Sequence, residues 1–131
     1  MTPRLNGIDH VHVEVGDRAE AEQWYETVLG LRRVEKLMVW ATESGPLTME
    51  DENGTVHLAL FETEKPAGES TIAFGVSGEE FMAWKAHLES HSLQLRLTDH
   101  ELAYSLYFHD PYQNMHEITT WDRDHVATRL A

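Results

Sequence analysis

The sequence contains no cysteine, which excludes disulfide bridges, a thiolate nucleophile and a cysteine-ligated zinc site. It has no apolar run near the roughly 20 residues of a membrane span. The first residues also lack the apolar core of a signal peptide. We therefore expect a cytoplasmic protein with no membrane partner. Its 131 residues suit a single domain, residues 1–131, with one hydrophobic core.

Positive charge is scarce, with 10 lysines and arginines against 23 aspartates and glutamates, a formal net charge of −13. Such a surface repels nucleic acid and anionic lipid, so we expect a small-molecule substrate as the partner. An anionic substrate would need a locally positive site, for instance a bound cation. Histidine, by contrast, is abundant, with nine residues whose positions matter more than their number.

The first half of the chain predicts a strand, a helix and three more strands. Residues 8–15 alternate between an apolar face and a face that carries His10, His12 and Glu14, the pattern of a half-buried strand. Asp17 with Glu20 predicts the start of a helix and Gly30 its end. The remaining strands are expected near 32–41, 47–50 and 55–61, with a hairpin turn at Asn53-Gly54.

The second half repeats this order. Residues 71–76 predict a strand, and Ser77 with Glu80 predicts the start of a second helix. Strands are expected near 94–98, 104–108 and 115–121. The chain therefore predicts an α+β fold of two βαβββ modules, about 8–62 and 70–121, joined by a linker at 63–69 and followed by a loose polar tail at 122–131. We expect a cupped mixed sheet with the helices on its outer face.

The inner strand faces are polar, small or aromatic rather than apolar. They carry His10, His12 and Glu14; His57, Ala59 and Phe61; Thr71, Ala73 and Gly75; and Glu117, Thr119 and Trp121. A solvated sheet face normally shows lysine, arginine and threonine, whereas small residues leave room and buried polar ones need partners. We therefore expect a polar-lined pocket shared by the sheets, with Trp40, Tyr107 and Trp121 as an apolar substrate wall or, alternatively, as core residues.

His10, His57 and Glu117 lie on three of these strands, facing the same way if the repeat register holds. Two imidazoles and one carboxylate can bind a divalent ion and leave positions open for substrate. The simpler interpretation, a hydrogen-bonded structural histidine, applies to each taken alone. His12 shares the face of His10 and is the natural substitute ligand, a supporting residue or a substrate contact. His116 should point to the helix side.

Two stretches resemble the vicinal oxygen chelate superfamily, which includes glyoxalase I, extradiol dioxygenases, methylmalonyl-CoA epimerase and the fosfomycin- and bleomycin-resistance proteins. The first is Ile8-Asp-His-Val-His-Val-Glu-Val with Trp24-Tyr25 and Leu29-Gly30-Leu31; the second is Tyr107-Phe-His-Asp-Pro111 with Asn114 and Glu117-Ile118. The resemblance covers about residues 7–121. It implies the fold strongly and the reaction weakly.

The resemblance also implies metal ligands on the first and last strand of each module. His10 is similar to the first-strand histidine and Glu117 to the last-strand glutamate. His57, or Ala59 in another register, stands where glyoxalase-like members carry a glutamate, and Thr71 stands where they carry a histidine, so at most three of four usual ligands are present. Gln113 occupies a turn position where the family usually has glycine.

The resemblance implies a homodimer and a divalent ion, Zn, Ni, Mn or Fe(II), that binds two neighbouring substrate oxygens. The leading hypothesis is a metal-dependent enzyme of the glyoxalase/dioxygenase type, a lyase, isomerase or extradiol-type dioxygenase, in which Glu117 or His12 moves protons. The alternative, favoured by Thr71, is a metal-free binding protein that sequesters a small organic ligand. Three strands after each helix argue against an unrelated ferredoxin-like dimer.

Overall fold

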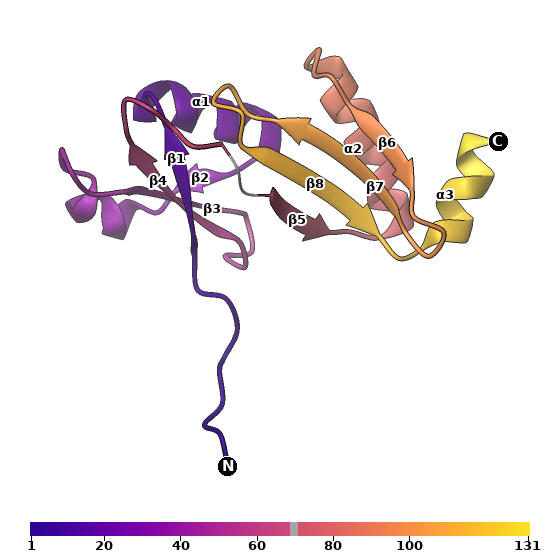
Figure 1. The fold of residues 1–131 in the computed structure, drawn as a ribbon, viewed down its shortest axis with the longest axis horizontal. Helices are drawn as coiled ribbons and strands as arrows, with labels where there is room; N and C mark the ends of the chain where they lie inside the picture. Colours follow the sequence, from indigo (N-terminus) through magenta and orange to yellow (C-terminus); the bar gives the residue numbers. More distant parts are fainter. Residues whose placement is uncertain (69–70) are drawn as a thin grey trace. The chain divides into compact units, whose positions relative to one another are not determined.

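The computed structural model describes residues 1–68 and 71–131; Glu69, in the expected linker, and Ser70, at the expected start of the second module, lie outside these ranges. The chain divides into two compact units, Met1–Pro66 and Ala67–Ala131. Each unit contains a four-stranded mixed sheet with helices (Figure 1). The predicted α+β fold of two βαβββ modules is confirmed. No helix in the described ranges is both long and apolar enough to cross a membrane.

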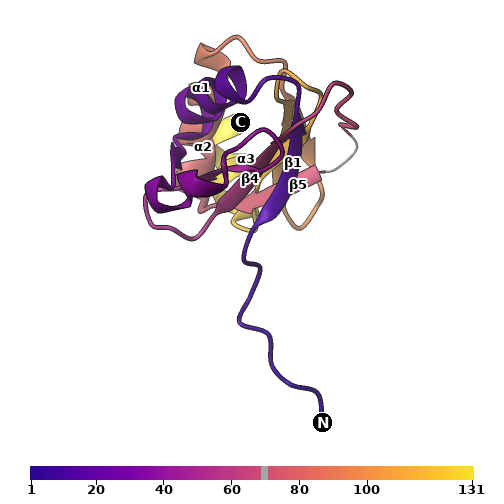
Figure 2. The same ribbon diagram turned by 90° about the vertical axis from the view of Figure 1, so that its left-hand side faces the viewer.

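The first unit has the strand order β1-β4-β3-β2. β1 pairs in parallel with β4, whereas β3 is antiparallel to both of its neighbours. Its strands are β1 (Val11–Val15), β2 (Arg32–Arg33), β3 (Leu47–Glu50) and β4 (His57–Glu62), with the helix α1 (Arg18–Leu29) after β1. The residues before β1 form an extended segment without regular structure (Figure 2).

The helix α1 begins and ends where the sequence predicts. The Asp17 side chain accepts a hydrogen bond from the Glu20 backbone N–H at 3.0 Å, which satisfies one of the free donors of the first turn. Gly30 ends the helix with φ 70°, a left-handed conformation that glycine adopts without steric cost. Tyr25 is fully buried, so α1 packs its apolar side on the sheet.

The strand expected near 32–41 is wrong beyond its first two residues. Only Arg32–Arg33 pairs with β3, and the chain then forms a 3-10 helix, η1 (Glu35–Trp40). Val34, Leu37 and Trp40 are spaced three apart, which places them on one side of a 3-10 helix rather than on alternating strand faces. Val34 is buried and Leu37 half-buried, whereas Trp40 is 55% exposed, so this row is only partly covered.

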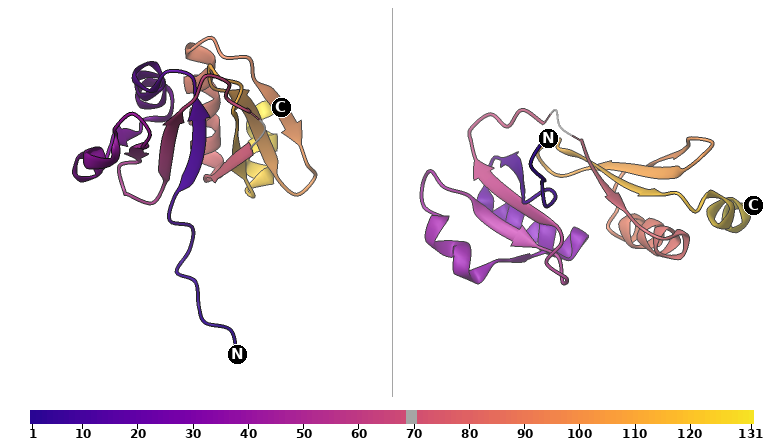
Figure 3. Two further views of the ribbon diagram at one scale, coloured as in Figure 1. Left: turned by 60° about the vertical axis from the view of Figure 1, so that its left-hand side comes forward. Right: turned by 90° about the horizontal axis from the view of Figure 1, so that it is seen from below.

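The second unit repeats the topology with strand order β5-β8-β7-β6. β5 pairs in parallel with β8, and β7 is antiparallel to both neighbours. Its strands are β5 (Thr71–Gly75), β6 (Arg96–Asp99), β7 (Tyr104–His109) and β8 (Met115–Thr120), and its helices are α2 (Gly78–Ser90) and α3 (Arg123–Leu130). Both helices lie on the same face of this sheet (Figure 3).

The loose tail expected at 122–131 is wrong, because residues 123–130 form α3. Val126 is fully buried, and α3 packs against α2. Arg123 holds the helix to the sheet through two hydrogen bonds to the Asp99 carboxylate, at 3.0 and 2.6 Å. The tail contains few apolar residues, so its sequence shows no clear helical pattern. In the structure, the buried Val126 and the ion pair between Arg123 and Asp99 hold α3 in place.

Strand β8 sorts its side chains by strict alternation. His116, Ile118 and Thr120 are buried on the helix side, whereas Glu117 and Thr119 lie on the opposite face. The prediction that His116 points to the helix side is confirmed; its ring stacks on Phe74. Burial lowers the pKa of His116 to about 4, although the nearby Asp110 carboxylate raises it in part.

Candidate functional site

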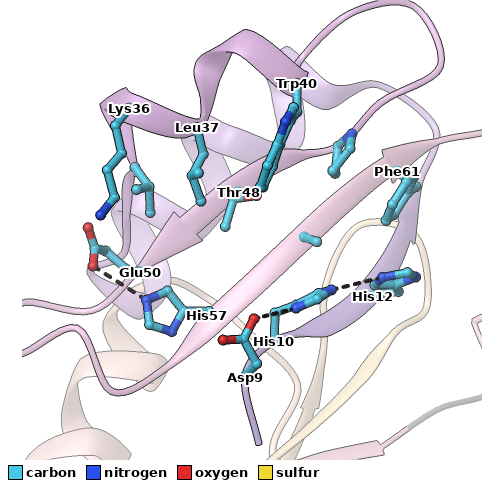
Figure 4. Close-up of a pocket in the computed structure, with 13 residues that line it drawn as sticks. Asp9, His10, His12, Lys36, Leu37, Trp40, Thr48, Glu50, His57 and Phe61 are labelled. Atoms are coloured by element: carbon cyan, nitrogen blue, oxygen red, sulfur yellow. Dashed lines mark hydrogen bonds and ion pairs between the residues drawn. The ribbon is translucent and has the colours of Figure 1, made fainter.

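The first unit contains a pocket of ≈ 560 Å³ on the sheet face that carries the histidines. Figure 4 shows side chains from the segment before β1, from η1 and from strands β3 and β4 meeting in it. Its lining residues are Asp9, His10, His12, Val34, Lys36, Leu37, Trp40, Pro46, Thr48, Glu50, His57, Ala59 and Phe61. The alternation predicted for residues 8–15 and 55–61 therefore placed His10, His12 and His57 correctly on one face.

His10 lies one residue before β1 and makes two contacts through its ring nitrogens. Nδ1 lies 2.8 Å from Oδ2 of Asp9, and Nε2 lies 3.1 Å from Nε2 of His12. A neutral His10 that donates its Nδ1 hydrogen to the carboxylate must carry a lone pair on Nε2. Asp9 therefore fixes the tautomer of His10 and leaves Nε2 as the basic atom that faces the pocket.

His57 begins β4 and faces Glu50 rather than the other two imidazoles (Figure 4). The two residues pair across the β3–β4 hairpin, and Nε2 of His57 lies 3.6 Å from Oε1 of Glu50. The hairpin turn is held by Asp51, whose carboxylate accepts backbone hydrogen bonds from Thr55 and Val56 at 2.7 and 2.9 Å. The rigid turn thus positions both Glu50 and His57.

The opposite wall of the pocket carries apolar side chains together with Lys36 of η1. Val34, Leu37 and Trp40 supply it from the 3-10 helix and the residue before it. Phe61 packs on the ring of His12 with centroids 4.5 Å apart, which limits the orientations that this imidazole can take. Trp40 gives this wall an aromatic surface on which a planar organic group can stack.

Glu117 lines a pocket of ≈ 400 Å³ formed by the second unit. Ser105 donates a hydrogen bond to its Oε2 at 2.7 Å, and the Ser105 hydroxyl is in turn 2.9 Å from that of Thr119. Because Ser105 is fully buried, the Glu117 carboxylate is held in one orientation with Oε1 left for other partners. The other lining residues are Ala73, His100, Leu102, Ala103, Thr119 and Trp121.

The remaining predicted substrate residues also belong to the second unit. Trp121 is 76% exposed at the rim of the Glu117 pocket. Tyr107 pairs with Glu117 in the β7–β8 register, and its hydroxyl lies 2.9 Å from Nε2 of His100. Thr71 begins β5 with an exposed side chain. The structure thus brings His10, His12, His57 and Trp40 into one pocket, and Glu117 and Trp121 into another.

The imidazole donors fit a divalent ion of the borderline type, since a carboxylate-supported histidine is a common metal ligand. Across residues 1–68 and 71–131, however, no three histidine, aspartate or glutamate side chains are arranged to hold a metal ion. Two residues of these sites, Asp9 and Ser105, are not predicted from the sequence. Asp9 could have been found from the sequence, because it directly precedes His10 and a neighbouring carboxylate can reach the imidazole. Ser105 could not, because its contact with Glu117 depends on the pairing of β7 with β8.

Comparison with known proteins finds one family model, described as the Glyoxalase/Bleomycin resistance protein/Dioxygenase superfamily, which matches residues 7–118. No curated protein matches the chain. Solved structures do match. An integron cassette protein from the mobile metagenome of a Halifax Harbour sewage outfall is 23% identical, with a TM-score of 0.73. The match covers 88% of this chain and 99% of the cassette protein.

Two further structures carry functional names. A fosfomycin resistance protein, FosX, from Listeria monocytogenes, solved with Mn(II) and sulfate, is 14% identical with a TM-score of 0.69, covering 98% of this chain and 100% of its own. A glyoxalase/dioxygenase from Nostoc punctiforme is 19% identical with a TM-score of 0.72, covering 92% and 94%. At these identities the likeness establishes the fold.

Proposed function

The chain belongs to the glyoxalase/bleomycin resistance protein/dioxygenase superfamily, and we propose that it is a metal-dependent enzyme that acts on a small oxygenated organic substrate. The observation that carries this proposal is the His10 imidazole, whose Nδ1 is engaged by Asp9 at 2.8 Å so that Nε2 faces a pocket with two more imidazoles. Such an arrangement is typical of a histidine that binds metal through the other nitrogen.

The proposed ligands in the first unit are an imidazole pair that includes His10, for which the sequence predicts His57; the third ligand that the sequence predicts, Glu117, belongs to the second unit. Zn, Ni, Mn and Fe(II) all accept this donor set. The Mn(II) bound by the FosX protein of similar fold supports a divalent ion in general. Thr71, in place of a fourth ligand, leaves coordination positions for substrate.

The bound ion would act as a Lewis acid toward two neighbouring substrate oxygens. The protein supplies the rest of the site. Trp40 and Phe61 give an apolar wall against which the carbon skeleton of the substrate packs. Glu117, held by Ser105, and His12 are the proposed groups for proton transfer. A lyase, an isomerase and an extradiol-type dioxygenase are all compatible with these groups.

Metal analysis of the full chain, purified without a histidine tag, tests the proposal. We expect close to one equivalent of a divalent metal after reconstitution, and a thermal shift that grows with metal concentration. Less than about a tenth of an equivalent of every metal tried would refute metal dependence, because a protein with its ligands in place normally retains measurable affinity. Light scattering on the same sample checks the expected homodimer.

A second function, metal-free binding of a small organic ligand, is favoured by two observations. No three ligands converge in the part of the chain that the structure describes, and the wall made by Leu37, Trp40 and Phe61 suits a planar apolar group. This function predicts thermal shifts with aromatic ligands and none with metals. A Trp40→Ala variant should then lose the ligand response, whereas His10→Gln should keep it.

A further inference from the structure

The closest pair of ring nitrogens in the first-unit pocket belongs to His10 and His12, and it shapes the metal site. Their Nε2 atoms lie 3.1 Å apart and point toward each other (Figure 4). His12 lies on β1 and His10 lies one residue before this strand begins, and both side chains line the pocket. The ring centroids are 5.1 Å apart with the planes inclined by 25°.

We propose that His10 and His12 together form a two-histidine chelate for the divalent ion, with His12 as the second imidazole ligand in place of His57. This assignment rests on the proposed metal dependence. Ligand nitrogens about 2.1 Å from one ion are about 3.0 Å apart at a right angle and about 3.4 Å apart at the tetrahedral angle. The observed 3.1 Å falls between these values. Because the two Nε2 atoms point toward each other, both rings must turn until their lone pairs converge on the ion.

The surroundings of each ring support this role. Asp9 holds Nδ1 of His10 and so presents a lone pair at Nε2. Phe61 packs on His12 and limits its rotation. If His10 keeps its hydrogen on Nδ1, the hydrogen between the two Nε2 atoms belongs to His12. For an ion to bind both Nε2 atoms, that hydrogen must move to Nδ1 of His12, so that the ring stays neutral and presents a lone pair at Nε2.

His57 has a different partner. Its Nε2 lies 3.6 Å from Oε1 of Glu50, at the hairpin end of the pocket. To bind the ion through that atom, His57 must leave the carboxylate, which raises the cost of ligation. The His57–Glu50 pair is therefore assigned to the pocket wall. A ligating His12 cannot also transfer a proton through Nε2, because the ion occupies the lone pair of that nitrogen.

The test titrates metal-stripped, untagged full chain with Zn(II) by calorimetry, and with Cu(II) followed by pulsed EPR, which counts bound imidazoles. His12→Gln should weaken Zn(II) binding by about 100-fold and reduce the EPR count from two imidazoles to one, because removing a ligand exceeds the 10–100-fold cost of removing a supporting group. His57→Gln is the matched control and should change the affinity by less than about threefold.

Two further variants guard the measurement. His12→Phe keeps a ring packed on Phe61 and removes the nitrogens, so it should match His12→Gln if ligation rather than packing is lost. His91→Gln removes one ring of the pair formed by His87 on α2 and His91 just after it, whose ring centroids lie 4.7 Å apart, and identifies metal bound there instead. Melting curves without metal establish that each variant is folded.

The outcomes separate the two claims. If the wild type binds no metal, the proposed function fails. If the wild type binds metal and His12→Gln binds it equally well, only the chelate is refuted. If His57→Gln loses affinity as much as His12→Gln, His57 is a ligand too and its assignment to the pocket wall is wrong.

Discussion

Ser105 on β7 donates a 2.7 Å hydrogen bond to Oε2 of Glu117 on β8. Register places Ser105 opposite Thr119, so the bond to Glu117 crosses diagonally to the next residue on the same face of β8. The buried Ser105 hydroxyl has one hydrogen, which it donates to the carboxylate. Its oxygen also lies 2.9 Å from the Thr119 hydroxyl, which in turn donates to the Tyr104 carbonyl at 3.3 Å. The carboxylate is thereby fixed before any ligand arrives.

Replacing Ser105 with alanine should therefore loosen Glu117 and destabilise the protein. Hydrogen bonds to charged groups contribute about 1.5–3 kcal/mol, so we expect a loss of roughly 2 kcal/mol in the free energy of unfolding, measured by urea titration. Thr119→Val keeps the Ser105–Glu117 bond and should cost less than about 1 kcal/mol. If both variants lost the same free energy of unfolding, the loss would come from removing a buried hydroxyl in general and not from the hydrogen bond to Glu117.

The stability of the protein should depend on pH through His116. Burial lowers its pKa in the folded state to about 4, below the usual 6.5, so between these values the unfolded state binds more protons. Stability should fall as the pH drops from 6.5 to 4 and be unaffected by this group above 6.5. The full effect is roughly 3 kcal/mol, at about 1.4 kcal/mol per pKa unit.

Urea titrations of the wild type and of His116→Gln across pH 4–8 measure this effect. The variant cannot titrate at this position, so its stability should decline less between pH 6.5 and pH 4, even though it starts lower because of altered packing against Phe74 and Phe108. Parallel pH profiles for the two proteins would contradict a neutral buried imidazole.

Asp51 should stabilise the hairpin that positions Glu50 and His57. Burial raises the pKa of Asp51, but hydrogen bonds from Val56 and Thr55 outweigh it and lower the pKa overall. Asp51→Asn should cost about 1 kcal/mol at pH 7, the size of a lost capping interaction. A lowered aspartate pKa contributes stability at neutral pH that is lost as the pH falls through the folded-state pKa, so the cost should shrink below about pH 4.

Glu52→Gln provides the charge-matched control for Asp51→Asn. Glu52 is exposed in the same turn, and its neutralisation should change stability by less than about 0.5 kcal/mol. Chemical-shift changes at Glu50 and His57 report on the hairpin, and they should appear in the Asp51 variant only.

Gln113 is strained, and glycine should relieve that strain. Its φ is 71°, in the left-handed region that costs a residue with a side chain about 1–2 kcal/mol. Glycine removes this cost but adds about 0.5–1 kcal/mol of unfolded-state entropy, so Gln113→Gly should stabilise the protein by about 0.5–1 kcal/mol. Gln113→Ala should give no such gain in stability, measured by urea titration, because alanine retains the Cβ. If alanine stabilised the protein as much as glycine, the gain would come from removing the rest of the glutamine side chain and not from relieving backbone strain.

Local sequence signals predicted several elements accurately. Asp17 with Glu20 and Ser77 with Glu80 marked both long helices, and in each the cap side chain accepts from the predicted backbone N–H. These signals work because capping satisfies donors within one turn of the chain. The unusual glutamine at 113 likewise marked a position where the backbone has positive φ.

Other elements depended on contacts distant in sequence. η1 stands where a strand is expected, and its residues Leu37 and Trp40 line a pocket together with Phe61, which no local pattern reveals. α3 formed in an expected loose tail because Val126 is buried and Arg123 binds Asp99, 24 residues away. Propensity is weak in both segments, so tertiary packing decided their conformation.

The sequence by itself determined the two-module fold, the face of the first sheet that carries His10, His12 and His57, and the face of the second sheet that carries Glu117, because strand alternation has a period of two and needs only local order. The tertiary structure decided which atoms meet within each unit: Nε2 of His10 with Nε2 of His12, His57 with Glu50, and Glu117 with Ser105. Strand pairing and side-chain rotamers set those distances, and both follow from packing across the sheet rather than from the order of residues along one strand.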